Sequence, residues 1–263
     1  MSATSADNAS FWDHLDVLRG VLVRILVVTG VVAVGAFVCM PWIFDHVIMA
    51  PCQPDFPIYA LFNKIAGLAD PDFHVDVVSI ELASQLFVHF SAACWTALII
   101  AFPIIIFLLW GFISPALYPS EKRGIRKAFL FGNFMFYLGV AMGYFLVFPL
   151  AVRFLATYQL SDAIRPIVSL NSYMDNFFTL LLMMGAVFEL PLLAWLLGKM
   201  GLLTRDFFGH YRRYAIVVLL IVAAIITPTG DPFTLFLVFL PIYALWEASA
   251  RLVPPAEVID HEN

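Results

Sequence analysis

The 263-residue sequence carries little charge for its length. Asp, Glu, Lys and Arg make up 13% of the residues, whereas a soluble domain contains about 25%. Hydrophobic residues make up 62%, and the mean hydropathy is +0.93. A soluble globule of this size has too little interior to bury that much apolar surface. The composition therefore indicates a protein whose solvent is lipid.

Several chemical signatures are also missing. The three cysteines form no CxxC pair, which argues against a disulfide framework or a zinc site. The sequence has no P-loop, no HExxH motif and no Gly-x-Ser motif of the rhomboid-type intramembrane proteases. It also lacks the basic stripe typical of nucleic-acid binding. We therefore expect neither an enzyme nor a bound metal or cofactor, and no nucleic-acid partner.

Long apolar runs are what the sequence does contain, and six of them predict membrane helices. They cover residues 21–44, 82–113, 128–150, 173–197, 214–227 and 233–246. The last two are short: fourteen residues of helix rise about 21 Å, against a hydrocarbon core of about 30 Å. The pattern predicts an all-α membrane protein that forms one domain over residues 1–263, with short fifth and sixth helices.

The distribution of Lys and Arg predicts the orientation. If six helices cross, the polar segments that share a side with both ends hold eleven of these residues, and the opposite side holds Lys64, Arg153 and Arg165. We therefore expect residues 1–19 and the tail 252–263 to be cytoplasmic.

Glu189 is the most informative polar residue inside an apolar run. It lies ten residues before Lys199, so a helix places it about 15 Å deeper, near the middle of the bilayer. A carboxylate there costs several kcal/mol unless it is neutral, hydrated or paired, and Pro191 can bend the helix beside it. Two interpretations stay open: a functional polar pocket, or a protonated glutamate that only bonds a neighbouring helix.

Three further features each allow two interpretations. Asp231, in the turn PTGDP, is either an ordinary turn aspartate or a carboxylate held below the membrane surface. Glu121 lies among four basic residues, so by itself it reads best as their solvated ion-pair partner. Gly139 and Gly143 form a GxxxG motif, which allows close helix packing within the chain or with a partner.

Several long motifs occur in an order that resembles one family, the TatC proteins. They are FWDHLDVLRGVL, FISPALYPSEKR, FYLGVAMGYFLVFPLAVRFL, FELPLL and RRYAIVVLLIVAAIITPTGDPFTLFLVFLPIYALWE. The resemblance runs from about residue 11 to residue 251. The resemblance implies a six-helix receptor of the twin-arginine protein translocase in the bacterial cytoplasmic (inner) membrane, with its helices in a concave bundle. Such a receptor binds twin-arginine signal peptides of folded cargo. It assembles with single-span TatA- and TatB-type partners and with further copies of itself, and the protonmotive force drives export.

The resemblance also implies a signal-peptide site. Glu121 matches the family's docking carboxylate, which reverses the interpretation based on charge alone, and a carboxylate can accept two parallel hydrogen bonds from a guanidinium. The family's HLxELR motif reads HLDVLR here, so Val17 replaces a second glutamate. We expect Asp13, one helical turn earlier, or the adjacent Asp16 to supply that charge. Arg19, Phe112 and Pro115 also match the family's site motifs.

Other matches concern transport rather than docking. Pro51, Tyr144 and Pro149 match motif residues of the first outer loop and the third helix. Glu189 and Asp231 match buried or turn carboxylates, and the last two helices are expected to contact the single-span partners. The alternative function is a proton- or cation-coupled transporter of small solutes that uses Glu189 and Asp231, although no repeat symmetry supports it.

Overall fold

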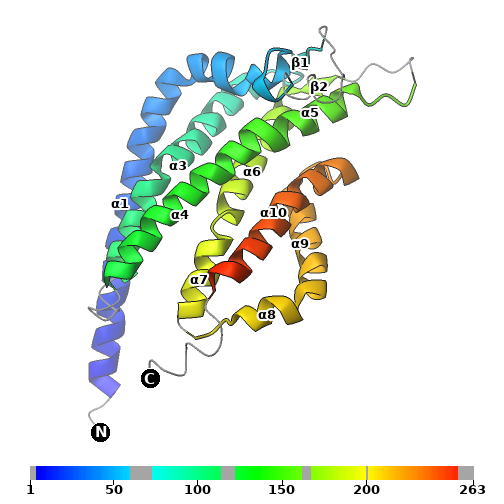
Figure 1. The fold of residues 1–263 in the computed structure, drawn as a ribbon. Coiled ribbons are helices and arrows are strands. Elements are labelled where there is room, and N and C mark those ends of the chain that lie inside the picture. Colours follow the sequence, from blue (N-terminus) through cyan, green and yellow to red (C-terminus); the bar gives the residue numbers. More distant parts are fainter. Residues whose placement is uncertain (1–3, 60–72, 114–121, 162–166, 200, 254–263) are drawn as a thin grey trace. The chain divides into compact units, whose positions relative to one another are not determined.

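The computed structural model describes residues 4–59, 73–113, 122–161, 167–199 and 201–253 (Figure 1). Helices make up most of these residues. They are α1 (Thr4–Ile43), α3 (Ser84–Ile113), α4 (Lys122–Met142), α5 (Phe148–Thr157), α6 (Leu170–Val187), α7 (Leu190–Lys199), α8 (Arg205–His210), α9 (Arg212–Ile226) and α10 (Pro232–Leu252). The all-α prediction is confirmed for the described part of the chain.

Five helical segments are long and apolar enough to cross a membrane. They are Leu15–Tyr59, Ser84–Leu109, Phe129–Thr157, Leu170–Lys199 and Pro232–Leu252. Two of them contain a π-helical turn: η1 (Phe44–Ile48) follows α1, and η4 (Gly143–Val147) joins α4 to α5. The fourth consists of α6 and α7 with a break at Phe188 and Glu189, close to the bend expected from Pro191.

The last two helices differ in length, which corrects one expectation. α9 has 15 residues and rises about 22 Å, so it is short as predicted. α10 has 21 residues and rises about 31 Å, which is enough to cross a bilayer. Its apolar run ends at Trp246, but the helix continues through Leu252. The hydrogen bonds between backbone groups of a helix do not require apolar side chains, so the helix can extend beyond the apolar run.

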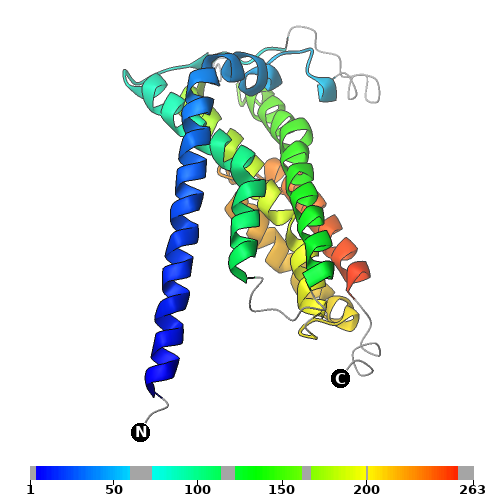
Figure 2. The same ribbon diagram turned by 90° about the vertical axis from the view of Figure 1, so that its left-hand side faces the viewer.

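Two groups of residues each form their own set of contacts: 1–40 with 89–133, and 41–88 with 134–263. In the first group, the long helix α1 and helix α3 (Figure 2) meet where His89 stacks on Phe37, with ring centroids 4.0 Å apart. Phe107 of α3 contacts Phe129 of α4 edge to face, at 6.3 Å.

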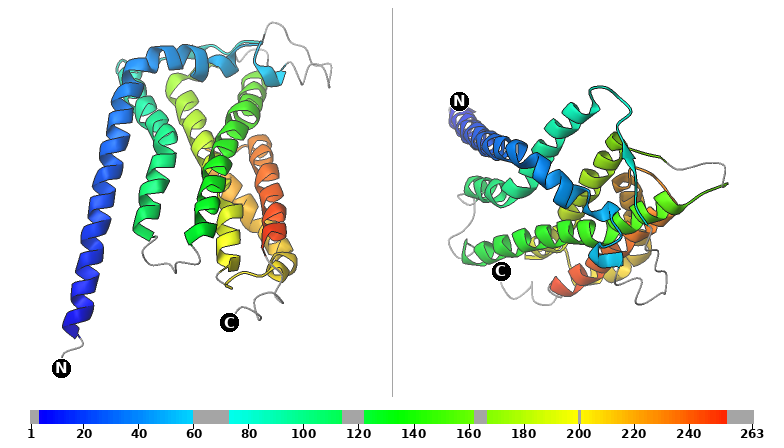
Figure 3. Two further views of the ribbon diagram at one scale, coloured as in Figure 1. Left: turned by 60° about the vertical axis from the view of Figure 1, so that its left-hand side comes forward. Right: turned by 90° about the horizontal axis from the view of Figure 1, so that it is seen from above.

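The second group is built around α10 and α6. α10 packs against α7, α8 and α9 (Figure 3) and also contacts α5. Large side chains near this centre are almost fully buried, namely Phe148, Leu180, Met184, Val238 and Ile242. The core of this group therefore lies among the helices that follow residue 134.

The GxxxG motif packs within the chain. A Cβ added at Gly139 would lie 2.5 Å from the carbonyl oxygen of Met184 and 2.8 Å from Cβ of Phe188. One added at Gly143 would lie 3.3 Å from Cα of Leu181. Gly139 in α4 and Gly143 in η4 thus let the third span approach α6 closely. Of the two interpretations of the motif, the structure supports packing within the chain.

A short parallel strand pair, absent from the sequence-based prediction, joins two connecting segments. β1 (Val77–Val78) pairs with β2 (Val168–Ser169), with Val77 opposite Val168 and Val78 opposite Ser169. Close by, the hydroxyl of Ser84 donates a hydrogen bond to Oδ1 of Asn171. Segments about 90 residues apart in sequence are therefore fastened together.

Candidate functional site

At the end of the first span, side chains from other spans donate hydrogen bonds to its free backbone carbonyls. After η1 the chain turns through η2 (Ala50–Cys52), where Cys52 N–H bonds the carbonyl of Met49 instead of continuing the helix. Two carbonyls before this turn accept from tyrosines: Tyr144 Oη donates to the Val47 oxygen at 2.9 Å, and Tyr173 Oη donates to the Ile48 oxygen. Free carbonyls at a helix end need such partners, most of all away from water.

A third tyrosine ties together the residues that matched the transport motifs. Tyr59 Oη lies 2.8 Å from the carbonyl oxygen of Pro51 and 3.0 Å from that of Pro149, and its hydrogen is shared between them. Tyr59 is 1% exposed, and Pro51 and Pro149 are buried. The structure thus brings Pro51, Tyr144 and Pro149 into one cluster. We call its three hydroxyl donors, Tyr59, Tyr144 and Tyr173, the tyrosine cap.

Aromatic rings and one cation surround the tyrosine cap. The guanidinium carbon of Arg153 lies 5.1 Å from the ring centre of Tyr59 and 5.3 Å from that of Phe73. Phe148 contacts Tyr173 edge to face at 5.2 Å. A cation over aromatic faces and edge-to-face rings both add to the packing energy. The rings and the Arg153 guanidinium therefore pack around the tyrosine cap and add to its stability.

Glu189 lies in the break between α6 and α7. Its N–H bonds the carbonyl of Ala186 at 3.1 Å, and its own carbonyl accepts from Leu193 N–H at 3.0 Å. The side chain is half-buried, and within the described part of the chain no donor bonds its carboxyl group. The backbone groups of Glu189 are thus satisfied, while no described residue bonds its carboxyl group.

Asp231 begins α10 as its N-cap. Its Oδ1 accepts from Thr234 N–H at 2.7 Å, and its Oδ2 accepts from the hydroxyl of Thr229 at 2.6 Å. Partial burial alone would raise the pKa of Asp231, but the bonds from Thr229 and Thr234 outweigh it and lower the pKa below its usual value. The turn-aspartate interpretation of this residue therefore has a direct structural basis.

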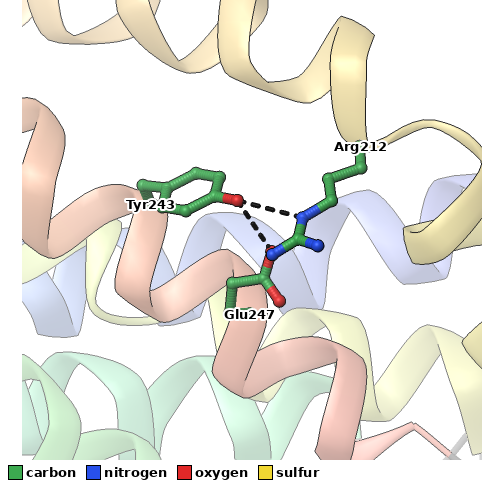
Figure 4. A network of polar contacts seen from close by, with 3 residues as sticks. All are labelled: Arg212, Tyr243 and Glu247. Carbon is green, nitrogen blue, oxygen red and sulfur yellow. Dashed lines mark hydrogen bonds and ion pairs between the residues drawn. The ribbon is translucent and has the colours of Figure 1, made fainter.

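A polar network joins the start of α9 to α10. Arg212 Nε donates to Tyr243 Oη at 3.0 Å, and Tyr243 Oη donates to Glu247 Oε1 at 2.9 Å. Arg212 Nη2 lies 2.7 Å from the same Glu247 oxygen (Figure 4). The ion pair is partly exposed, so its main effect is to fix how the two helices are aligned rather than to add much stability.

The residues expected to bind a signal peptide are only partly described. Asp16 and Arg19 are exposed on α1, and Phe112 is half-buried in the last turn of α3. Pro115, Glu121 and the side chain of Asp13 lie outside the described residues. The helix assignment of residues 4–43 confirms that Asp13 is one turn before Val17. Which aspartate supplies the missing charge stays a prediction.

Tyr59, Tyr173 and His89 were not singled out from the sequence. Each bonds a backbone carbonyl far away in the chain, as in the 90-residue separation of Tyr59 from Pro149. Hydrophobic periodicity carries no signal for such bonds. Only the Phe37 carbonyl, the acceptor for His89, had a local clue in the sequence, because Pro41 removes the N–H four residues later.

Comparisons with known proteins agree with one another. The family model described as Sec-independent protein translocase protein (TatC) matches residues 13–241. A Deinococcus radiodurans protein named Sec-independent protein translocase protein TatC is 33% identical over 256 residues, which cover 97% of this chain and 90% of that protein. A protein of the same name from a Blattabacterium species is 31% identical, covering 91% and 92% of the two chains.

The fold is similar as well. A crystal structure titled as the twin-arginine translocase receptor TatC in DDM matches with a TM-score of 0.74 and 28% sequence identity. The match covers 91% of this chain and 99% of that one. Sequence and structure therefore point to the same protein family over nearly the same length.

Proposed function

Because the chain belongs to the TatC family, we propose that it is the multi-span receptor of a Sec-independent, twin-arginine protein translocase. The observation that carries this proposal is that similarity to TatC proteins in sequence and in fold extends over nearly the whole chain. The protein acts by binding and not by catalysis. The cytoplasmic (inner) membrane of a bacterium is its proposed location.

In this proposal the chain crosses the membrane six times and both ends are cytoplasmic. Five segments have the length and apolarity to cross, and α9 is the additional one. Its packing along α10 supports a hairpin in which α9 runs through the membrane toward the turn at Asp231. The eleven Lys and Arg residues on the proposed cytoplasmic side, against three on the other, support this orientation.

The ligand of the proposed cytoplasmic site is a pair of arginines in a signal peptide. Glu121 supplies one carboxylate, and Asp13 or Asp16 supplies a second from α1. The exposure of Asp16 on the helix supports its availability to a ligand. Arginine suits such a site better than lysine, because its planar guanidinium offers two parallel donors to each carboxylate.

Single-span membrane proteins of the TatA and TatB type are the proposed partners. The half-buried, unmatched carboxyl group of Glu189 supports a polar contact with a partner helix at this depth. Since no nucleotide motif occurs in the sequence, the protonmotive force is the proposed energy source for export.

The decisive test is cross-linking of the chain, in inverted membrane vesicles, to a peptide with a photoreactive group beside its twin arginines. We expect strong cross-linking for the parent protein, and at least a tenfold loss with a twin-lysine peptide or with Glu121→Gln. Asp76→Asn is the matched control, because it removes an exposed carboxylate in the segment proposed to face the other side. Equal cross-linking in every case would contradict a signal-peptide receptor and favour the solute transporter.

The same assay separates the two aspartates. Asp13→Asn and Asp16→Asn each remove one charge without changing size. The variant that weakens cross-linking identifies the residue that replaces the glutamate absent at Val17. Full cross-linking in both variants would show that Glu121 acts without a second carboxylate from α1.

A further inference from the structure

Two prolines interrupt the backbone hydrogen bonding of the first span. Pro41 lies inside α1, and Pro51 lies in the turn η2. A proline has no N–H, so the carbonyl four residues earlier loses the donor that a continuing helix would provide. The two carbonyls concerned are those of Phe37 and Val47.

Both of these carbonyls accept a hydrogen bond from a ring on another helix. His89 Nε2, on α3, lies 2.9 Å from the Phe37 oxygen, and its ring stacks on the Phe37 ring. Tyr144 Oη, in η4, lies 2.9 Å from the Val47 oxygen. A carbonyl oxygen only accepts, so Nε2 of His89 carries a hydrogen.

We propose that Pro41 with His89, and Pro51 with Tyr144, form two coupled pairs that fasten the first span to its neighbours. In each pair the proline frees a carbonyl, and a ring donor on another helix binds it. His89 and Tyr144 are thus positioning residues. The proposal stands apart from the proposed function, because it concerns how the chain holds itself together.

Exclusion of water makes the two members of each pair depend on one another. Where packing or lipid keeps water from a free carbonyl, a proline without its ring donor leaves a polar group unpaired. With an N–H at the proline position, the helix can bond the carbonyl itself, and the ring donor becomes redundant. The benefit of each ring bond therefore depends on the proline.

Tyr173 provides a contrast within the same region. Its hydroxyl donates to the carbonyl of Ile48, yet the residue four positions later is Cys52, which has an N–H and uses it to bond Met49. A side-chain ring can therefore donate a hydrogen bond to a carbonyl even where the residue four positions later is not a proline. What distinguishes the proposed pairs is energetic coupling, and that quantity is measurable.

Double-mutant cycles on the purified full-length protein test the coupling through thermal unfolding in detergent. His89→Phe keeps a ring that can stack on Phe37 and removes only the donor. With Pro41 present we expect this change to lower Tm by about 2–4 °C, the usual effect of losing one interaction of this size in a chain of this length. With Pro41→Ala also present, we expect less than half of that loss.

The second pair is tested in the same way, with Tyr144→Phe in the Pro51 and Pro51→Ala backgrounds. The crossed combinations, Pro41→Ala with Tyr144→Phe and Pro51→Ala with His89→Phe, are the controls and should be additive. Tyr173→Phe combined with Pro41→Ala should also be additive. Coupling as strong in the crossed cycles as in the matched cycles would overturn the proposal.

A rescue variant separates hydrogen bonding from packing. His89→Gln keeps an N–H donor, whereas His89→Leu has none. We expect the glutamine variant to melt higher than the leucine variant when Pro41 is present and equally when Pro41→Ala is present. If the Pro51 variants do not accumulate, the Pro41 cycle alone decides: equal Tm losses in both backgrounds would refute the proposal.

Discussion

Two helix interruptions in this chain handle their polar groups in opposite ways. At the end of α1, the turn at Pro51 leaves the carbonyls of Val47 and Ile48 without helix partners, and Tyr144 and Tyr173 satisfy both. At the break between α6 and α7, the backbone bonds are closed locally, but no described group bonds the Glu189 carboxyl. The described residues thus supply hydrogen-bond donors for the carbonyls at the first interruption, but none for the carboxyl group at the second.

We expect this difference to separate a structural feature from a functional one. An unmatched carboxyl group inside an apolar helix costs free energy, so a chain that only needed stability would gain by replacing it. The tyrosine cap, in contrast, leaves no such group and is expected to matter mainly for stability. Four substitutions test this distinction, and they are given in order of their expected effect on the free energy of unfolding, largest first.

Gly139→Ala should have the largest effect, because it forces the third span away from α6 just before the break. The added Cβ would lie 2.5 Å from a backbone oxygen that has little freedom to move. We expect a loss of about 3 kcal/mol, at the upper end for overpacking, measured by thermal unfolding. Gly35→Ala, with open space around its Cβ, is the control and should be neutral or slightly stabilising. Similar losses for both would show that α6 yields to the clash.

Tyr59→Phe should come next, because it removes a hydroxyl shared by two buried carbonyls. The expected loss is about 2 kcal/mol, within the range for leaving buried polar groups unsatisfied. Tyr158→Phe is the matched control, since this ring is 65% exposed, and it should change stability little. If Tyr59→Phe left the unfolding temperature unchanged, the tyrosine cap would not be the stabilising centre described above.

Asp231→Ala should cost about 1 kcal/mol, because it removes the N-cap of α10. The folded pKa of Asp231 is lowered, so its contribution is fully present above the unfolded value of about 3.9 and is lost as the pH falls toward the folded value. The difference in Tm between parent and variant should thus stay constant from about pH 7 to 5 and shrink below about pH 4. The exposed Asp55→Ala control should show no such trend, and a constant difference at acid pH would contradict the assignment.

Glu189→Gln should change stability least, by less than about 0.5 kcal/mol, because no described partner is lost. It should instead reduce co-purification of single-span partner proteins, measured in mild detergent. A large loss of stability with unchanged partner binding would select the other interpretation of this residue, a glutamate that only bonds a neighbouring helix.

Composition and hydropathy were sufficient to predict the helical membrane fold. The second span, expected at residues 82–113, is α3 (Ser84–Ile113), and the bend near Pro191 is the break at Glu189. The length of α10 was missed because hydropathy reports where a helix is apolar, not where its backbone ends. The partners of Tyr59 and His89 were missed because bonds between distant segments leave no periodic pattern.

The pairing of β1 with β2 has a consequence for counting membrane crossings. Segments joined in a parallel ladder are expected to emerge on one surface of a bilayer, so the residues between them would traverse it an even number of times. Two candidate spans, Ser84–Leu109 and Phe129–Thr157, lie between the strands in the sequence and agree with that number. The pairing of four backbone residues therefore predicts an even number of crossings here without reference to any charge.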